Sequence, residues 1–167
     1  MISKLRFART HWGPLGMWAW VIWWFGHNYA HRGLLFRVVY YALDIAVTRA
    51  LIGAKIPPQV SIGDRTGFVH DAMGVVLNPG VSIGSDCTIY HQVTLGTRSG
   101  NPGAPKVGNG VLIGAGAKVL GPVVIGDYAS IGANSVVIHD VPAGATAIGV
   151  PARIIPAKPG WAKTPRR

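Results

Sequence analysis

Aliphatic side chains recur at every sixth position through the second half of the chain. All but one member of this series, Asn101, are aliphatic: Leu77, Ile83, Ile89, Leu95, Asn101, Val107, Ile113, Val119, Ile125, Ile131 and Val137. The residue four places after each member is nearly always small or slender, and a glycine directly follows several members, as at Gly84, Gly108 and Gly126. A helix repeats near 3.6 residues and a half-buried strand near 2, so neither element explains this period.

A short repeat built from an aliphatic residue, a small residue and a glycine predicts a β-helix. The aliphatic side chain would point inward, the small residue would fit the tight interior, and the glycine would give the backbone freedom at a corner. Each hexad would form one face of a triangular coil, so about 18 residues would complete one turn. We therefore predict a mainly β fold, a parallel β-helix preceded by a short N-terminal helical segment.

The chain divides into three predicted parts. Residues 1–55 are apolar and aromatic and lack the repeat, residues 56–155 form the β-helix domain, and residues 156–167 form a basic, proline-containing tail. The first part holds the run "PLGMWAWVIWWFG" and then "LLFRVVYYALDIAVTRALIG", which reads as a helix that stops at Gly53. The first run is too short to span a bilayer, and Arg37, Asp44 and Arg49 interrupt the second.

Two interpretations of residues 1–55 stay open. The segment either forms a helical cap that packs on the β-helix or on a sister subunit, or lies as an interfacial anchor with its aromatic and basic residues at headgroup level. Five tryptophans lie between Trp12 and Trp24, close to Lys4, Arg6 and Arg9. The anchor interpretation predicts peripheral contact between the N-terminus and a membrane.

Composition narrows the functional classes. The formal net charge is +10, which attracts nucleic acid, anionic lipid or phosphorylated small molecules. The chain has no nucleic-acid motif and no basic run interleaved with aromatic residues, so no nucleic-acid partner is expected. The single cysteine, Cys87, falls on a small interior position of the repeat and is predicted to be buried. No His, Cys and Asp set has metal-ligand spacing, so no metal site is predicted.

From about Ile56 to Ile155 the sequence resembles the hexapeptide-repeat acyltransferases, above all the serine acetyltransferase branch and the related O-acetyltransferases of surface-polysaccharide pathways. The segments that carry the resemblance are "IPPQVSIG", "GVVLNPGVSIG", "HQVTLGT", "APKVGNGVLIGAGAKVLGPVVIG" and "GVPARII". The resemblance implies a left-handed parallel β-helix, a homotrimer, and acetyl-CoA bound as acyl donor between neighbouring coils. It also implies that a His early in the β-helix is the general base, set near an acidic partner.

The pair His70 and Asp71 stands where this base is expected. Counting forward from Gly63 places His70 on the family's catalytic position, whereas counting back from Gly74 places Asp71 there, because the chain holds one extra residue between the two. We predict a bulge at this point, since bulges re-aim side chains near sites. We assign the base to His70, because an imidazole accepts a hydroxyl proton readily at neutral pH. The alternative is a surface His–Asp pair.

Two other positions bear on the same chemistry. His91, in "YHQVTLG", is a second catalytic candidate, expected near a corner and facing outward. The family's usual acid aligns with Lys55, so the orienting acid is missing from its expected place. Asp71 is a sequence neighbour of His70, but neighbours on a strand point to opposite faces.

The resemblance also suggests which residues hold the cofactor. Gly96, Thr97, Ala115 and Ala133 match family positions along which the pantetheine arm of acetyl-CoA runs. Small residues there let the arm approach the backbone. Lys118 and Arg153 are candidates for the CoA phosphates, as a compact and a forked cation respectively, and each is equally a candidate for a solvated surface charge.

The acceptor is where the chain departs from the serine enzymes. In those enzymes an Arg-His pair that binds the acceptor precedes "PK" in a mid-chain loop. Here the loop reads "GTRSGNPGAPK", is two residues shorter, and has Gly103 and Ala104 in those places, although Arg98 lies in the same loop.

We therefore favour O-acetyl transfer to a hydroxyl of a sugar or surface-polysaccharide precursor. Serine O-acetylation, as in cysteine biosynthesis, is the alternative, and a catalytically inactive trimeric scaffold is a third reading. Because acetyl-CoA is a cytosolic cofactor, a cytoplasmic protein is predicted, and the anchor interpretation adds peripheral contact with the inner face of the cytoplasmic membrane.

Overall fold

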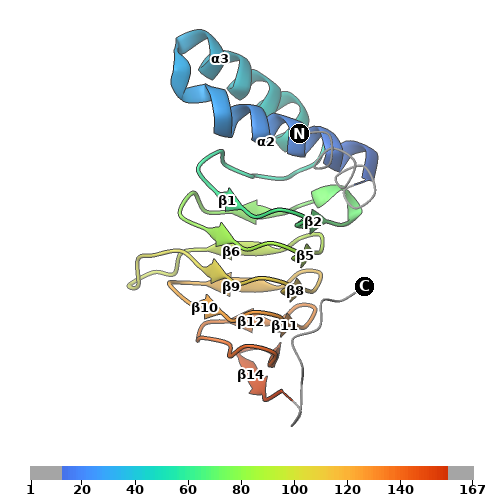
Figure 1. The fold of residues 1–167 in the computed structure, drawn as a ribbon, viewed down its shortest axis with the longest axis vertical. Helices are drawn as coiled ribbons and strands as arrows, with labels where there is room; N and C mark the ends of the chain where they lie inside the picture. The colour runs from blue at the N-terminus through green and yellow to red at the C-terminus, as the bar shows by residue number, and fades with distance from the viewer. Residues whose placement is uncertain (1–12, 158–167) are drawn as a thin grey trace.

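The computed structural model describes residues 13–157 as a three-sided coil of short strands, capped at one end by a helical hairpin (Figure 1). Successive coils stack in parallel, so each side of the coil is a sheet. The first sheet comprises β1 (Ser61–Ile62), β4 (Ser82–Ile83), β7 (Lys106–Val107) and β10 (Val124–Ile125). The second comprises β2 (Gly67–Phe68), β5 (Thr88–Ile89), β8 (Leu112–Ile113), β11 (Ser130–Ile131), β13 (Thr146–Gly149) and β14 (Ala152–Ile155). The third comprises β3 (Val76–Leu77), β6 (Thr94–Gly96), β9 (Lys118–Leu120) and β12 (Val136–Val137). The predicted class, a left-handed parallel β-helix, is confirmed.

The six-residue series lines the interior of the coil. Its aliphatic members are all buried, and the sheet registers stack them into columns such as Ile89, Ile113 and Ile131, with Phe68 in the same column one coil earlier. The prediction for Cys87 is confirmed, because its side chain is buried, and this burial raises the pKa of its thiol. Asn101, the one exception in the series, lies in the loop between β6 and β7, outside the strands that form the core.

The N-terminal segment forms a hairpin of two helices over the first coil. α2 (Gly13–Tyr29) lies between the β-helix and α3 (Leu34–Leu43), with the 3₁₀ turn η1 (Ala30–Arg32) between the helices and the π-helical turn η2 (Asp44–Arg49) after them (Figure 1). Trp20 and Trp23 are buried in the same apolar core as the coil, whereas Trp18 is exposed. α2 therefore packs on the β-helix, as the cap interpretation predicted.

The coil departs from its regular step between Phe68 and Leu77, which are nine residues apart instead of six. Here η3 (His70–Ala72) contains three consecutive residues with left-handed backbone, at φ of 57°, 60° and 57°. This conformation is costly for residues other than glycine, asparagine and aspartate. The extra residues thus make a tight turn at a corner of the coil, where the sequence analysis expected a bulge in a strand.

Two features complete the described part of the chain. At the C-terminal end, β14 folds back antiparallel onto β13, and the loop between β6 and β7 protrudes from the side of the coil (Figure 1). Between residues 13 and 157, no helix is long and apolar enough to cross a membrane. The predictions for Lys4, Arg6, Arg9 and Trp12, and for the tail from residue 158 onward, concern residues outside this described part.

Candidate active site

One corner of the coil, between the second and third sheets, collects four of the candidate residues. The strand registers align Phe68, Ile89, Ile113 and Ile131, and two residues after each of them come His70, His91, Ala115 and Ala133. Backbone hydrogen bonds tie the lower levels together, from Gly116 N–H to the His91 carbonyl and from Asn134 N–H to the Ala115 carbonyl. We call His70, His91, Ala115 and Ala133 the corner column.

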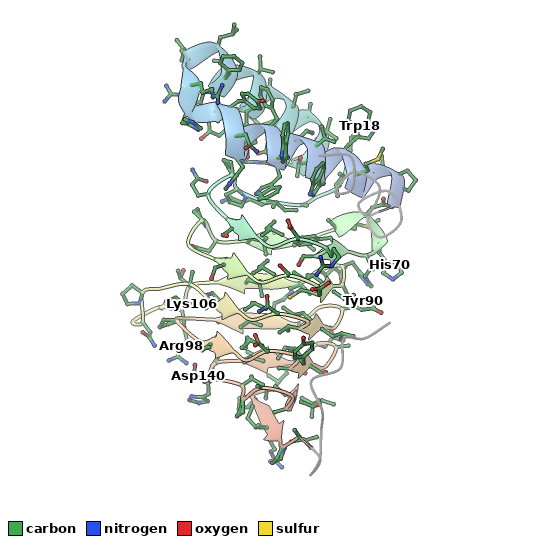
Figure 2. The ribbon with its side chains drawn as sticks, in the orientation of Figure 1. Trp18, His70, Tyr90, Arg98, Lys106 and Asp140 are labelled. Carbon is green, nitrogen blue, oxygen red and sulfur yellow. The ribbon has the colours of Figure 1, made fainter. Side chains whose placement is uncertain are left out.

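His70 lies at the exposed upper end of the corner column, next to the helical hairpin (Figure 2). Its ring meets the ring of His91 edge-to-face, with the centroids 5.0 Å apart, and lies 5.9 Å from the ring of Tyr90. Because His91 and Tyr90 lie in the next coil, the structure brings together two histidines that are 21 residues apart in the sequence. The imidazole of His70 is therefore both accessible and held on one side by aromatic rings.

His91 is half-buried, whereas the sequence analysis expected it to face outward. Its Nδ1 is buried, and among residues 13–157 it finds no hydrogen-bond partner. Buried polar nitrogens are nearly always hydrogen-bonded, so this unpaired nitrogen sets His91 apart from most buried polar groups.

Asp71 contacts the hairpin. Its Oδ1 accepts hydrogen bonds from the backbone N–H groups of Leu15 and Gly16, each at 2.9 Å. These donors belong to the first turn of α2, whose N–H groups lack partners within the helix. A carboxylate at this end also complements the helix dipole. Asp71 thus ties the turn that carries His70 to α2.

Ala115 and Ala133 leave the corner open below the histidines. Ala115 is half-buried and Ala133 is exposed, and neither side chain extends beyond a methyl group. Lys118, at the start of β9, donates a hydrogen bond from Nζ to the carbonyl of Gln92 at 2.6 Å. Because Gln92 directly follows His91, this ammonium group lies beside the corner column.

The other three cofactor candidates lie away from the corner. Gly96 ends β6 and Thr97 follows it, so both occupy the opposite edge of the third sheet. Arg153, on β14, is paired with Ile148 of β13. Five strand spacings separate β2 from β14 along the second sheet, which places Arg153 about 24 Å below the level of His70. An extended cofactor such as acetyl-CoA is long enough to approach both the His70 level and the Arg153 level.

The mid-chain loop folds onto the next coil. A Cβ added to Gly103 would come within 2.8 Å of Pro122, and the Cβ of Ala104 lies beside Gly80. The loop is thus packed down at the two positions where the family places its acceptor-binding pair. Arg98 lies in this loop on the opposite side of the coil from His70 (Figure 2).

Sequence reasoning missed Tyr90 and the contact between Asp71 and α2. Tyr90 could have been found from the spacing alone, because it stands 21 residues after Val69 and therefore one coil below it. The partners of Asp71 are backbone groups 55 and 56 residues away, which carry no sequence signal. Within residues 13–157, no cluster of three or more His, Cys, Asp or Glu side chains could hold a metal ion.

Comparisons with known proteins agree with this architecture. A family model described as bacterial transferase hexapeptide (six repeats) matches residues 104–139, and with the fold it defines the class as hexapeptide-repeat transferases. The chain is 49% identical over 110 residues to the serine acetyltransferase of Mycobacterium tuberculosis (strain ATCC 25618 / H37Rv), an alignment that covers 65% of this chain and 48% of the relative. It is 37% identical over 158 residues to the serine acetyltransferase of Staphylococcus aureus (strain Mu50 / ATCC 700699), covering 92% of this chain and 70% of the relative. The chain belongs to the serine acetyltransferase family.

A solved structure extends the comparison. The serine acetyltransferase of Brucella abortus strain S19, in complex with coenzyme A, aligns with a TM-score of 0.76 and 34% identity over 84% of this chain and 56% of that one. The chain spans 48% and 64% of the length of the first two curated relatives that it matches.

Proposed function

We propose that the protein is an acetyl-CoA-dependent O-acetyltransferase with His70 as its general base. The observation that carries the proposal is the corner column, in which His70 and His91 stand above Ala115 and Ala133. The two small residues leave room for a pantetheine arm, and Lys118 supplies positive charge beside it. A coenzyme A complex of a relative with the same fold supports acetyl-CoA as the acyl donor.

In the proposed reaction, His70 accepts the proton of the acceptor hydroxyl as that oxygen attacks the carbonyl carbon of the thioester. A carbon–oxygen bond forms, the carbon–sulfur bond breaks, and the proton passes from His70 to the departing sulfur of CoA. His91 restricts the orientation of the His70 ring by packing against it edge-to-face. Asp71 holds the turn against α2, so its role is positioning.

Serine is the acceptor that the relatives support best, since they are serine acetyltransferases. This replaces the sugar hydroxyl that the sequence alone favoured. A sugar hydroxyl stays as the second candidate because of one observation, that Gly103 and Ala104 fill the places of the family's Arg-His pair. Without that guanidinium, Arg98 is the arginine that this loop offers to a carboxylate, and Lys106 follows at the start of β7.

The proposed assembly is a homotrimer. Within one chain, Arg98 and His70 lie on opposite sides of the coil, so a loop that contacts the acceptor would have to meet the base of a neighbouring copy (Figure 2). The expected location is the cytoplasm, where the acyl donor occurs.

The proposal is tested by following the release of CoA thiol from acetyl-CoA with L-serine and, separately, with nucleotide sugars as acceptors. We expect His70→Ala to lower kcat by about 10² to 10⁴, the usual contribution of a general base, while CoA binding persists. His139→Ala is the matched control, because His139 is an exposed histidine remote from the corner column.

Full turnover by His70→Ala together with loss of turnover by His91→Ala would transfer the base to His91. A wild-type protein that neither binds CoA nor transfers acetyl groups to either acceptor class would be a scaffold. The preferred acceptor follows from the ratio of kcat/KM values for serine and the sugars.

A further inference from the structure

The outer surface of the helical hairpin carries many large apolar side chains that are exposed and do not pack against the rest of the chain. On α3 and η2, the exposed apolar side chains are Leu34, Leu35, Phe36, Val38, Val39, Tyr41, Leu43 and Ile45, and we call this set the outer face. Leu35 is 72% exposed and Leu34 is 68% exposed. Large contiguous apolar surfaces on soluble proteins mark sites of interaction.

The outer face is broader than the stripe that a helix presents to another helix. α3 and η2 bury only Tyr40, Asp44 and Thr48, at four-residue spacing along the side that faces α2. Apart from Arg37 and Arg49, the exposed large side chains around the rest of the circumference are apolar. Helix pairing uses about two positions in each seven, so one protein helix would leave much of the outer face uncovered. A fluid apolar layer can surround all of it.

The charges around the outer face point to the chemistry of the partner. Residues 13–55 contain four basic side chains, Arg32, Arg37, Arg49 and Lys55, and one acidic side chain, Asp44. Asp44 is buried, and its carboxylate accepts a hydrogen bond from Arg49 Nε at 2.7 Å. The cap therefore offers positive charge without an exposed carboxylate. A second cap would repel it, whereas an anionic surface would attract it.

Aromatic rings gather where the hairpin turns. Tyr29 and Phe36 stack with centroids 6.1 Å apart, and the Arg32 guanidinium lies 4.9 Å from the centre of the Tyr29 ring. Aromatic and basic side chains side by side are typical of the headgroup layer of a membrane. By contrast, Trp20 and Trp23 are buried against the coil and Trp18 is the exposed tryptophan of α2, so the outer face is the larger available apolar surface in the described part of the chain.

We propose that the outer face binds an anionic lipid membrane in its plane, with α3 and η2 in the headgroup layer and the β-helix projecting away from it. The apolar side chains would enter the boundary with the acyl chains, and Arg32 and Arg37 would meet lipid phosphates. This inference does not depend on the proposed acetyl transfer.

The test is sedimentation of the full-length protein with vesicles of phosphatidylcholine containing about a third phosphatidylglycerol, compared with phosphatidylcholine alone. We expect binding to the anionic vesicles that weakens as salt rises. Leu35→Gln combined with Val38→Gln should lower the partition coefficient by about tenfold or more, since each exposed side chain loses its burial in lipid. Arg37→Gln should lower it about fivefold, and only on anionic vesicles.

The matched control is Val150→Gln, because Val150 is also 72% exposed but lies at the far end of the β-helix. It should leave vesicle binding unchanged. A protein that stays in the supernatant of anionic vesicles at low salt overturns the proposal. So does a Leu35→Gln, Val38→Gln variant that binds vesicles normally but sediments as a smaller oligomer, because the outer face would then contact a second copy.

Discussion

At the scale of single residues, the candidate site depends on a backbone that few residues tolerate. His70, Asp71 and Ala72 share left-handed φ values, and Asp is the type among them that accepts this conformation most readily. The hydrogen bonds from Leu15 and Gly16 to Asp71 supply an external hold on the strained turn. Strained backbone persists where the surrounding structure over-determines it, and such places are often functional.

This arrangement predicts different results for two substitutions of Asp71. Asp71→Ala removes the acceptor for two N–H groups of α2, so it should lower the free energy of unfolding by about 1–2 kcal/mol. It should also lower kcat more than it changes KM, because the His70 turn loses its hold. Asp71→Asn keeps an acceptor oxygen and tolerates the left-handed backbone, so it should retain most of the stability and activity.

The measurements are urea unfolding and steady-state kinetics on both variants. Equal losses of activity in Asp71→Asn and Asp71→Ala, with stability unchanged, would show that the carboxylate itself takes part in the chemistry. That outcome would give Asp71 a catalytic role, for which the sequence made it a candidate beside His70.

At the scale of elements, the six-residue repeat could be predicted from the sequence, whereas the conformation of the η3 turn could not. Each interior position, such as Ile89 or Val119, repeats with neighbours six residues away in sequence, and the next coil returns to the same column. Local periodicity therefore specifies which side chains face inward. The direction of Asp71 depends on a helix that begins 58 residues earlier, and the packed-down loop at Gly103 depends on Pro122 of the next coil. Neither contact produces a periodic pattern in the sequence, so neither could be predicted from it.

The hairpin gives a second prediction at this scale. A Cβ added to Gly26 of α2 would collide with the ring of Tyr40 and would also lie 3.1 Å from Pro58. Helix propensity alone predicts that Gly26→Ala stabilises α2 by up to about 1 kcal/mol. Because the ring and Pro58 are already packed, overpacking should prevail and destabilise the protein by about 1–3 kcal/mol.

A double-mutant cycle with Tyr40→Leu isolates this contact in urea unfolding, since the smaller side chain should relieve part of the cost of Gly26→Ala. Additive losses in the double variant would place the strain at Pro58 alone. A gain in stability for Gly26→Ala would contradict the close packing of α2 on α3.

At the scale of the whole molecule, the proposed function depends on how copies of the chain would meet. The corner column runs down one edge of the coil, and the loop that carries Arg98 leaves from another side (Figure 2). In a closed ring of identical subunits, one surface of each copy meets a different surface of the next. The proposed trimer would therefore place the His70 corner of one subunit against the Arg98 loop of its neighbour.

Subunit mixing tests this pairing. His70→Ala and Arg98→Ala should each have low activity as separate trimers, the first through loss of the base and the second through weaker acceptor binding. When the two are mixed, denatured and refolded together, about a quarter of the interfaces in random trimers would pair an intact His70 with an intact Arg98. We therefore expect about a quarter of the wild-type activity, measured as thiol release, with light scattering to verify that the mixed species is a trimer. Activity that stays at the level of the separate variants in a verified mixed trimer would mean that both groups act within one chain. A stable, active monomer would contradict the proposed trimer itself.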